Sequence, residues 1–294
     1  MGKTKETAIL VNTWNDKKFL KGCFDNLQSQ TYKDFEIIMI DNNSSDGSVE
    51  YVKKNFPKIK IFALQENLGY TGGNNKGIEY SINNNFKYTF IMNNDAELEK
   101  DCLEKLINIM KSKDKIGIVV PEIYEYDEHK DKIYLRGGIM NLKMGAPKAV
   151  TINKEKDIYD VDTVSGCVLL VNNEVYKKTS AFYTGFFMYW DDPDFSLRVK
   201  RAGFENKYFT GTQVYHLGSG STKNTNFPKT YYLVRNRFIM IKMHAKFLDR
   251  MIFYFYFLIK FPYFILSKKN DREIYLSLLG IYHYLIKKEG KLLE

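Results

Sequence analysis

Short, uninterrupted apolar runs alternate with amphipathic segments over the first 120 residues. The runs lie at residues 8–11, 35–40, 59–62 and 88–92. Apolar residues recur at helical spacing over residues 19–27, and a further helix is expected from about Gly72 to Asn83. A strand buried on both faces is apolar throughout, whereas a helix lying on a sheet is apolar on one side only. The pattern therefore predicts an α/β fold whose mostly parallel central sheet is flanked by helices.

The second half of the chain is less regular. A buried strand is expected at residues 164–171, and a short helix from Asp192 to Arg201. From about Tyr231 the pattern becomes helical and rich in aromatic and basic residues. We therefore divide the chain into a main domain, residues 1–228, and a helical tail, residues 229–294.

Residues 252–266 are the most apolar part of the tail. Lys260 and Pro262 interrupt this run, which is also shorter than the roughly 18–20 residues that span a bilayer. The run favours an interfacial helix or hairpin over a spanning helix. A helix packed on the main domain, or an oligomer contact, explains the same pattern, so these interpretations stay open.

The net charge of +9 is concentrated in the tail. From Lys229 onward, thirteen lysines and arginines stand against five acids, a surplus of +8, so the first 228 residues are nearly neutral. This distribution argues against nucleic-acid binding by the main domain and suits an anionic membrane surface as partner of the tail.

The three cysteines lack metal-binding spacing and the first residues lack a signal-peptide pattern. We therefore expect a cytoplasmic protein.

Polar loops follow three of the predicted strands, at the edge where parallel sheets bind ligands. They lie after Val11 in the first strand, after Ile40 in the second, where the loop opens with Asp41, and after Met92 in the fourth, where Asp95 follows. The glycine-rich segment 67–77 is a further candidate. A carboxylate at such an edge accepts hydrogen bonds from a base or ribose, and glycines let the backbone approach a ligand closely. Asp95 is of the type that holds a hard divalent cation. Each loop, taken alone, is also explained as a plain turn or helix cap.

Three acids within four residues follow the aromatic run at 186–190. Asp191, Asp192 and Asp194 open the predicted helix. Crowding of carboxylates against aromatic rings raises their pKa and favours general-base chemistry. The same acids fit an ordinary helix N-terminus, where one residue caps the helix while its neighbour does chemistry. His216, after a later short strand, is a further candidate ligand, although a lone histidine is more often structural.

The order and spacing of the motifs are more specific than any one of them. They follow one another from residue 11 to residue 237 as VNTWN, IDNNSSDGS, NLGYTGGNNKG, NND, SGCVLLV, MYWDDPDFSLRVKRAGF, YHLGSGS and YYLVRNR. This succession resembles family 2 glycosyltransferases of the GT-A fold, and most of all the bacterial rhamnosyltransferases and galactofuranosyltransferases. The resemblance implies a GT-A domain with a Rossmann-like sheet and a C-terminal helical appendage. It also implies metal-dependent, inverting sugar transfer from a nucleotide-diphosphate donor to an acceptor hydroxyl.

The resemblance further implies roles for single residues. Asp192 would be the general base, while Trp190 and Asp191 would shape the acceptor pocket. Asp95 and His216 would bind Mg²⁺ or Mn²⁺. The donor-binding residues would be Thr13, Asp41, Asn67, Gly72, Asn74, Asn93 and Asn94. Asn93 stands where the family has the first acid of its DxD motif, which leaves the metal with fewer charged ligands.

The favoured donor is dTDP-rhamnose, with UDP-galactofuranose or another UDP-hexose as the alternative. The acceptor would be a cell-surface polysaccharide or a lipid-linked glycan at the inner face of the cell membrane, and homo-oligomerisation stays open. A nucleotide-sugar pyrophosphorylase or hydrolase would need a basic phosphate-binding signature, which VNTWN is not. A non-catalytic carbohydrate-binding protein of the same fold agrees with Asn93, but the intact acid pair and Asp95 argue against it.

Overall fold

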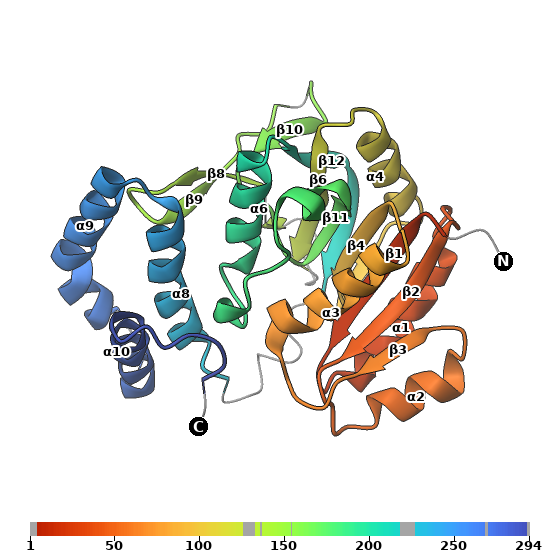
Figure 1. The fold of residues 1–294 in the computed structure, drawn as a ribbon, viewed down its shortest axis with the longest axis horizontal. Helices are drawn as coiled ribbons and strands as arrows, with labels where there is room; N and C mark the ends of the chain where they lie inside the picture. Colours follow the sequence, from red (N-terminus) through yellow and green to blue (C-terminus); the bar gives the residue numbers. More distant parts are fainter. Residues whose placement is uncertain are drawn as a thin grey trace.

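Within the described residues, which are 5–125, 133–135, 137–153, 155–217, 227–267 and 270–292 of a computed structural model, ten strands form one central sheet. Its strand order is β10-β12-β6-β11-β4-β1-β2-β3, with β5 paired to β12 and β7 paired to β6 (Figure 1). The strands of this sheet are β1 (Thr7–Thr13), β2 (Phe35–Asp41), β3 (Lys60–Ala63), β4 (Tyr88–Asn93), β5 (Ala96–Leu98), β6 (Ile116–Glu125), β7 (Ile133–Leu135), β10 (Ile158–Val161), β11 (Val168–Asn172) and β12 (Glu205–His216). A separate hairpin is formed by β8 (Gly138–Asn141) and β9 (Ala146–Ala149).

The apolar runs of the first half form the parallel part of the sheet, as predicted. β1 pairs in parallel with β2 and β4, and β2 pairs in parallel with β3. Beyond β4 the sheet is mixed, because β11 runs antiparallel between β4 and β6 while β6 and β12 are parallel to each other. The carboxyl ends of β1, β2 and β4 therefore lie at one edge, and the amino end of β11 reaches the same edge.

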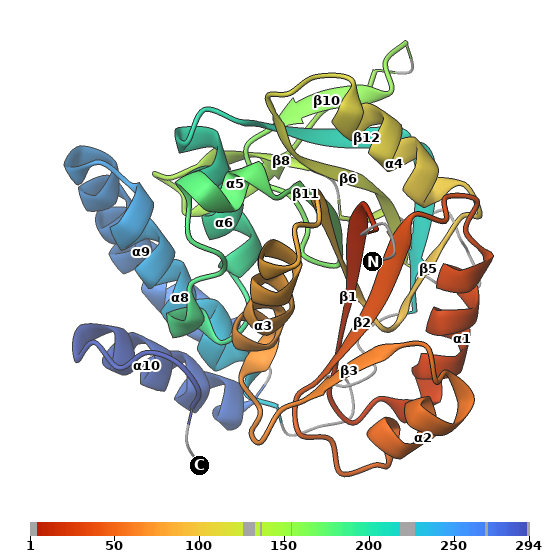
Figure 2. The same ribbon diagram turned by 45° about the vertical axis from the view of Figure 1, so that its right-hand side comes forward.

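Helices cover both faces of the sheet (Figure 2). One face carries α1 (Lys17–Ser29), α2 (Ser48–Asn55) and α4 (Cys102–Lys111). The other face carries α3 (Gly69–Asn83), α5 (Glu174–Lys178) and α6 (Asp191–Arg201), with the short 3₁₀ helix η1 (Thr184–Phe186) before α6. Because successive strand side chains point to opposite faces, β1 contributes Ile9 and Val11 to the first core and Ala8 and Leu10 to the second. This double burial explains why the strand is apolar without alternation.

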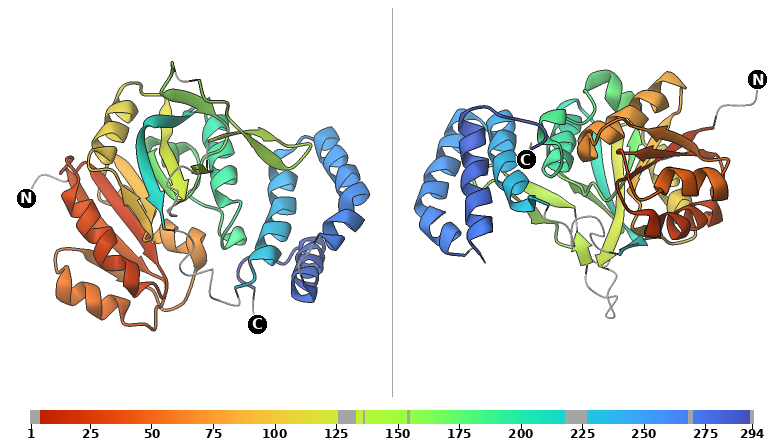
Figure 3. Two further views of the ribbon diagram at one scale, coloured as in Figure 1. Left: turned by 180° about the vertical axis from the view of Figure 1, so that it is seen from behind. Right: turned by 90° about the horizontal axis from the view of Figure 1, so that it is seen from below.

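The last three helices, α8 (Lys229–His244), α9 (Phe247–Leu266) and α10 (Asp271–Leu285), form a group beside α6 (Figure 3). α9 is one continuous helix, so Lys260 and Pro262 do not divide the apolar run into a hairpin. Its contacts with α8 and α10 are mainly aromatic, and the rings of Phe253, Phe257 and Tyr284 surround Phe238. In the described part of the chain, no helix combines the length and the hydropathy needed to cross a bilayer.

Candidate active site

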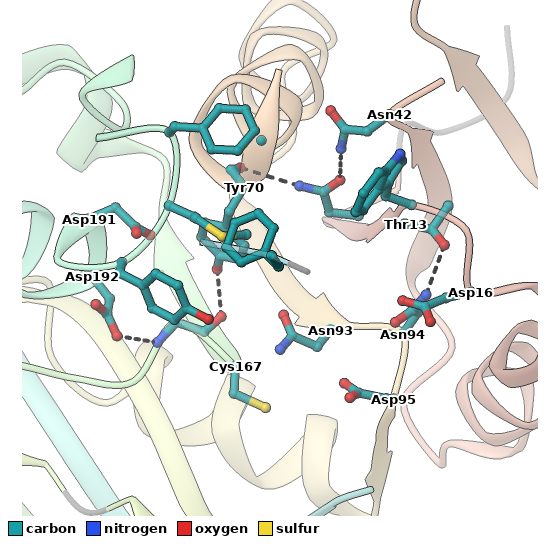
Figure 4. Close-up of a pocket in the computed structure, with 18 of the residues that line it drawn as sticks. Thr13, Asp16, Asn42, Tyr70, Asn93, Asn94, Asp95, Cys167, Asp191 and Asp192 are labelled. Carbon is teal, nitrogen blue, oxygen red and sulfur yellow. Dashed lines mark hydrogen bonds between the residues drawn. The ribbon is translucent and has the colours of Figure 1, made fainter. Parts of the chain in front are cut away.

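A cavity of about 320 Å³ opens where β1 and β4 end and where the segments before α3, β11 and α6 meet (Figure 4). It brings together eight of the residues predicted from the sequence. They are Thr13, Asn67, Asn93, Asn94, Asp95, Asp191, Asp192 and His216. Residues separated by up to about two hundred positions in the chain therefore share one cavity, as a single active site requires.

A network of amides shapes the side of the cavity formed by β1, β2 and β4. Asn94 Nδ2 donates a 2.8 Å hydrogen bond to Thr13 Oγ1, which ties the end of β4 to the end of β1. Asn42 Nδ2 donates to Asn12 Oδ1, and Asn12 Nδ2 donates to the carbonyl of Tyr70 at 3.3 Å. These side chains hold the start of α3 against the strand ends, so polar groups line a rigid edge.

Four of the predicted residues lie outside the lining of the cavity. Asp41 is buried, and its Oδ2 accepts a 2.9 Å hydrogen bond from the Ser44 amide inside the turn after β2. Asn74 Nδ2 donates to the Tyr70 carbonyl at 2.9 Å. The two other residues, Gly72 and Trp190, pack against different elements.

Gly72 and Trp190 are placed by packing. A Cβ at Gly72 would lie 2.6 Å from Leu68 Cβ, so this position requires glycine for the tight first turn of α3. Trp190 Nε1 donates a 2.9 Å hydrogen bond to the Leu233 carbonyl, and its ring packs on the aromatic cluster of the last three helices. The sequence predicted that Gly72 contacts the donor and that Trp190 contacts the acceptor; in the structure both residues lie in segments that line the cavity and are themselves outside its lining.

Asp95 and His216 form the part of the cavity that suits a metal. His216 Nε2 lies 3.2 Å from Asp95 Oδ1, since β12 ends next to the turn that follows β4. Burial works against the imidazolium, but hydrogen bonds with Asp95 and Cys167 raise the pKa of His216 to about 10. The described residues contain no group of three or more His, Cys, Asp or Glu arranged to hold a metal. A carboxylate and an imidazole fit a divalent cation whose remaining ligands are phosphate oxygens and water.

Asp191 and Asp192 lie at the opposite side of the cavity. Asp191 is buried, and Asp192 is partly buried. Burial raises the pKa of Asp192 to about 6, and burial with the adjacent Asp192 charge raises the pKa of Asp191 well above its usual value. A carboxylate with a pKa near 6 is ionised at neutral pH and still basic enough to take a proton in a reaction.

The third acid of this motif has a different role. Asp194 is fully buried, and its Oδ2 accepts hydrogen bonds from Arg198 Nε at 3.0 Å and Nη2 at 2.8 Å. Its Oδ1 lies 2.7 Å from His244 Nε2, which joins α6 to the end of α8. Although burial opposes ionisation, the hydrogen bonds with His244 and Arg198 lower the pKa of Asp194. Asp194 is thus a structural ion-pair partner, because helical spacing turns it away from the cavity.

The segment that leads into the acid pair has an unusual backbone. Phe187, Tyr189 and Trp190 have φ angles of 65°, 64° and 69°. Left-handed conformations of bulky residues cost on the order of 1–3 kcal/mol each and persist only where the surroundings enforce them. Trp190 precedes α6, so neither Asp191 nor Asp192 caps the helix, contrary to the interpretation that one of them does. Asp191 and Asp192 both line the cavity.

Several lining residues were missed by the sequence analysis. They include Trp14, Asp16, Tyr70, Phe227 and Lys229. Trp14 follows β1 directly, and its place in the VNTWN motif was the available signal. Lys229 was counted with the basic tail, yet it is the one lysine or arginine among the described lining residues. The boundary predicted from the sequence, between residues 228 and 229, thus falls between two lining residues, Phe227 and Lys229.

Comparison with known proteins agrees with this architecture. The model of glycosyl transferase family 2 matches residues 8–179. The low-salt glycan biosynthesis hexosyltransferase Agl10 of Haloferax volcanii is 25% identical over 253 residues, covering 84% of this chain and 79% of that protein. An N-acetylglucosaminyl-diphospho-decaprenol L-rhamnosyltransferase of Mycobacterium tuberculosis is 21% identical over 244 residues, covering 74% and 78%.

A solved structure of GalNAc-T7 with UDP, GalNAc and Mn²⁺ has a TM-score of 0.67 and 15% identity, covering 99% of this chain and 56% of that one. At this identity the likeness concerns the fold alone. The matched region holds the strand-end loops that line the cavity, and the family model spans more than half of the sequence. The chain therefore belongs to glycosyl transferase family 2 and has the GT-A fold.

Proposed function

We propose that the protein moves a hexose, with rhamnose favoured, from a nucleotide-diphosphate donor to a hydroxyl group of a cell-surface or lipid-linked glycan, with inversion. The observation that carries the proposal is the single cavity shared by the Asp191–Asp192 pair, the loops after β1 and β4, and the Asp95–His216 pair. These groups would supply a general base, a polar binding site for the nucleotide-sugar donor, and ligands for a cation.

The proposed reaction is a displacement at the anomeric carbon. Asp192 takes the proton of the acceptor hydroxyl, and the resulting oxygen forms a bond to that carbon from the face opposite the diphosphate. The bond between the carbon and the diphosphate oxygen breaks, and the nucleoside diphosphate leaves with its electron pair. Lys229, which lines the cavity, would offset the negative charge that develops on the leaving group. General-base assistance contributes typically about 10²–10⁴-fold in rate.

Asp95 and His216 would hold Mg²⁺ or Mn²⁺ together with the diphosphate. When bound, the cation supplies Lewis-acid and electrostatic stabilisation of the leaving group. The Mn²⁺ and UDP named for GalNAc-T7 support this choice of cofactor and donor class. Because His216 must be neutral to bind a metal, cation binding here would release a proton.

The choice of donor rests on the relatives. The mycobacterial relative is named as an L-rhamnosyltransferase that acts on N-acetylglucosaminyl-diphospho-decaprenol, which supports a rhamnose donor and a lipid-linked acceptor. UDP is the nucleotide named with GalNAc-T7, so a UDP-hexose stays the alternative.

Two features of the tail support the proposal that the protein acts at an anionic membrane surface. α9 exposes a row of apolar side chains along one side: Phe247, Met251, Phe255, Leu258 and Leu266 are between 46% and 83% exposed. A row of exposed apolar side chains is typical of surfaces that contact lipid or protein. The basic surplus of the tail, apart from the buried Arg235 and the cavity-lining Lys229, favours anionic lipid, at about 1 kcal/mol for each lysine or arginine near the membrane surface.

The test is a screen of nucleotide sugars with Mg²⁺ or Mn²⁺. We expect one donor to raise the melting temperature and to be hydrolysed slowly in the absence of an acceptor, and to be consumed faster when a glycan acceptor is added. Stabilisation by nucleotide sugars without any hydrolysis or transfer would support the non-catalytic carbohydrate-binding alternative instead.

A further inference from the structure

Two adjacent residues of α8 hold the segment that carries the acid pair. Asn236 Nδ2 lies within hydrogen-bond distance of three carbonyl oxygens, those of Phe186 at 2.9 Å, Met188 at 2.8 Å and Tyr189 at 3.1 Å. Asn236 is fully buried, so no solvent competes for this amide. The contacts fall on the stretch whose backbone adopts left-handed angles immediately before Asp191.

Arg235 orients the Asn236 amide and binds the same segment through further hydrogen bonds. Its Nε donates a 2.9 Å hydrogen bond to Asn236 Oδ1, and its Nη2 donates to the carbonyls of Gly185 at 3.0 Å and Phe186 at 3.1 Å. The guanidinium also lies 5.0 Å from the centre of the Tyr231 ring. The side chain is fully buried, so it contacts neither lipid nor a phosphate at the surface.

The end of the chain completes the arrangement. Arg235 Nη1 donates to the Gly290 carbonyl at 2.8 Å, and the Gly290 amide donates to the Gly185 carbonyl at 2.7 Å. The Leu292 amide donates to the Tyr232 hydroxyl at 2.8 Å. One buried cation thus joins α8, the segment before α6 and the segment after α10.

We propose that Arg235 and Asn236 are positioning residues that hold residues 185–190 in the left-handed course that presents Asp192 to the acceptor. The backbone needs such support because Phe187, Tyr189 and Trp190 would each favour right-handed or extended angles in a free chain. The buried side chains of Arg235 and Asn236 supply this support. Together they make five hydrogen-bond contacts to carbonyl oxygens of the segment, and their packed side chains need not rearrange to do so. The positional part of this inference is that Arg235 and Asn236 hold the segment, and it does not depend on the proposed function. The catalytic part is that the held segment presents Asp192 to the acceptor, and it rests on the proposed function.

The positional part is tested by the fluorescence of Trp190. The chain has two tryptophans, so Trp14→Phe leaves Trp190 as the single reporter of the segment. In that background we expect Asn236→Ala to shift the emission to longer wavelength and to increase quenching by acrylamide. The matched control is Arg237→Gln on the same helix, because Arg237 donates to the carbonyls of Met144 and Gly145 in the β8–β9 turn instead.

Arg235→Lys provides a second, milder variant. It keeps the charge but cannot span the carbonyls of residues 185, 186 and 290 at once, so we expect the same spectral change in smaller measure. Circular dichroism and thermal unfolding establish that each variant is folded. Spectra of the folded Arg235 and Asn236 variants that match the Arg237→Gln control would overturn the proposal.

The catalytic part is tested by steady-state kinetics of the full-length variants. We expect Asn236→Ala to lower kcat by about 10²-fold while the KM for the donor stays near that of wild type, because a displacement of about 1 Å is enough for such a loss. An unchanged kcat, or an equal loss in the Arg237→Gln control, would overturn it. If the wild-type protein transfers no sugar, the proposed function fails, and the fluorescence arm still decides the positional part.

Discussion

The amide of Gly166 donates a 2.9 Å hydrogen bond to Oδ2 of Asp192. The carbonyl of the same glycine accepts a 2.5 Å hydrogen bond from the Tyr70 hydroxyl. A Cβ at this position would lie 3.1 Å from the Tyr70 oxygen and 3.4 Å from Asp192 Cβ. One glycine before β11 therefore orients the proposed base and links α6 to α3, which is why the acid stays fixed although it lies at a helix end.

Replacement of Asp192 by asparagine removes the proposed base and preserves the shape of the side chain. We expect Asp192→Asn to lower kcat by about 10²–10⁴-fold, with donor affinity close to that of wild type. Transfer assays and calorimetry with the donor measure the two quantities. Near-wild-type transfer by this variant would refute the assignment of the base.

Stability provides a control for the same variant. The raised pKa means that the folded protein binds the Asp192 proton more tightly than the unfolded chain, so this contribution to stability is lost as pH rises through about 6. Because asparagine mimics the protonated form, Asp192→Asn should raise the melting temperature at pH 8 more than at pH 4. Equal melting-temperature changes at both pH values would contradict the raised pKa.

The same pKa sets the acid limb of activity. Since Asp192 must be ionised to accept a proton, we expect kcat/KM, which reports the ionisation of the free enzyme, to fall about tenfold for each pH unit below about 6. The measurement is kcat/KM from pH 4.5 to pH 8, with wild-type unfolding followed in the same buffers. A kcat/KM that stays flat down to pH 4.5 in the folded protein would exclude Asp192 as the base.

Loss of Asp95 should abolish metal-dependent donor binding. Asp95→Ala leaves His216 alone as a protein ligand, so calorimetry with Mn²⁺ and donor should show affinity no better than in the absence of metal. Asn93→Asp is the informative counterpart, because it adds a carboxylate to the cavity lining and should tighten Mn²⁺ binding. Unchanged metal-dependent affinity in Asp95→Ala would remove Asp95 from the metal site.

Lys229 should contribute to binding of the diphosphate. We expect Lys229→Met to weaken donor affinity by roughly 10- to 100-fold, in line with a hydrogen bond to a charged group of about 1.5–3 kcal/mol. Lys242→Met is the matched control, because Lys242 lies on the same helix and does not line this cavity. Equal affinities in the two variants would leave Lys229 without a role in donor binding.

The apolar row of α9 should mediate binding to anionic vesicles. Phe255→Glu and Leu258→Glu place charges at side chains that are 67% and 68% exposed, so neither change disturbs a buried contact. We expect less cosedimentation with anionic vesicles, and no change in oligomeric state by ultracentrifugation. Ile158→Glu, at a 43% exposed position on β10, is the control. Unchanged vesicle binding with altered oligomerisation would make this surface a contact between copies of the chain.

The sequence by itself determined the α/β class, the strands of the parallel half, and the order of the motifs. It could do so because a strand that is buried on both faces has a continuous apolar sequence, and because parallel strands bring their carboxyl ends to one edge of the sheet. The eight predicted residues that line the cavity come from such strand ends, or from motifs whose roles the family resemblance implied.

The tertiary structure alone decided how neighbouring residues divide their roles. Asp191 and Asp192 face the cavity while Asp194 pairs with Arg198 and His244, a division set by the helix phase. Arg235 is buried under the acid segment rather than exposed to lipid, because partners more than forty positions away in the chain satisfy its donors. Local sequence records which side chains are present, but long-range packing determines which groups each of them meets.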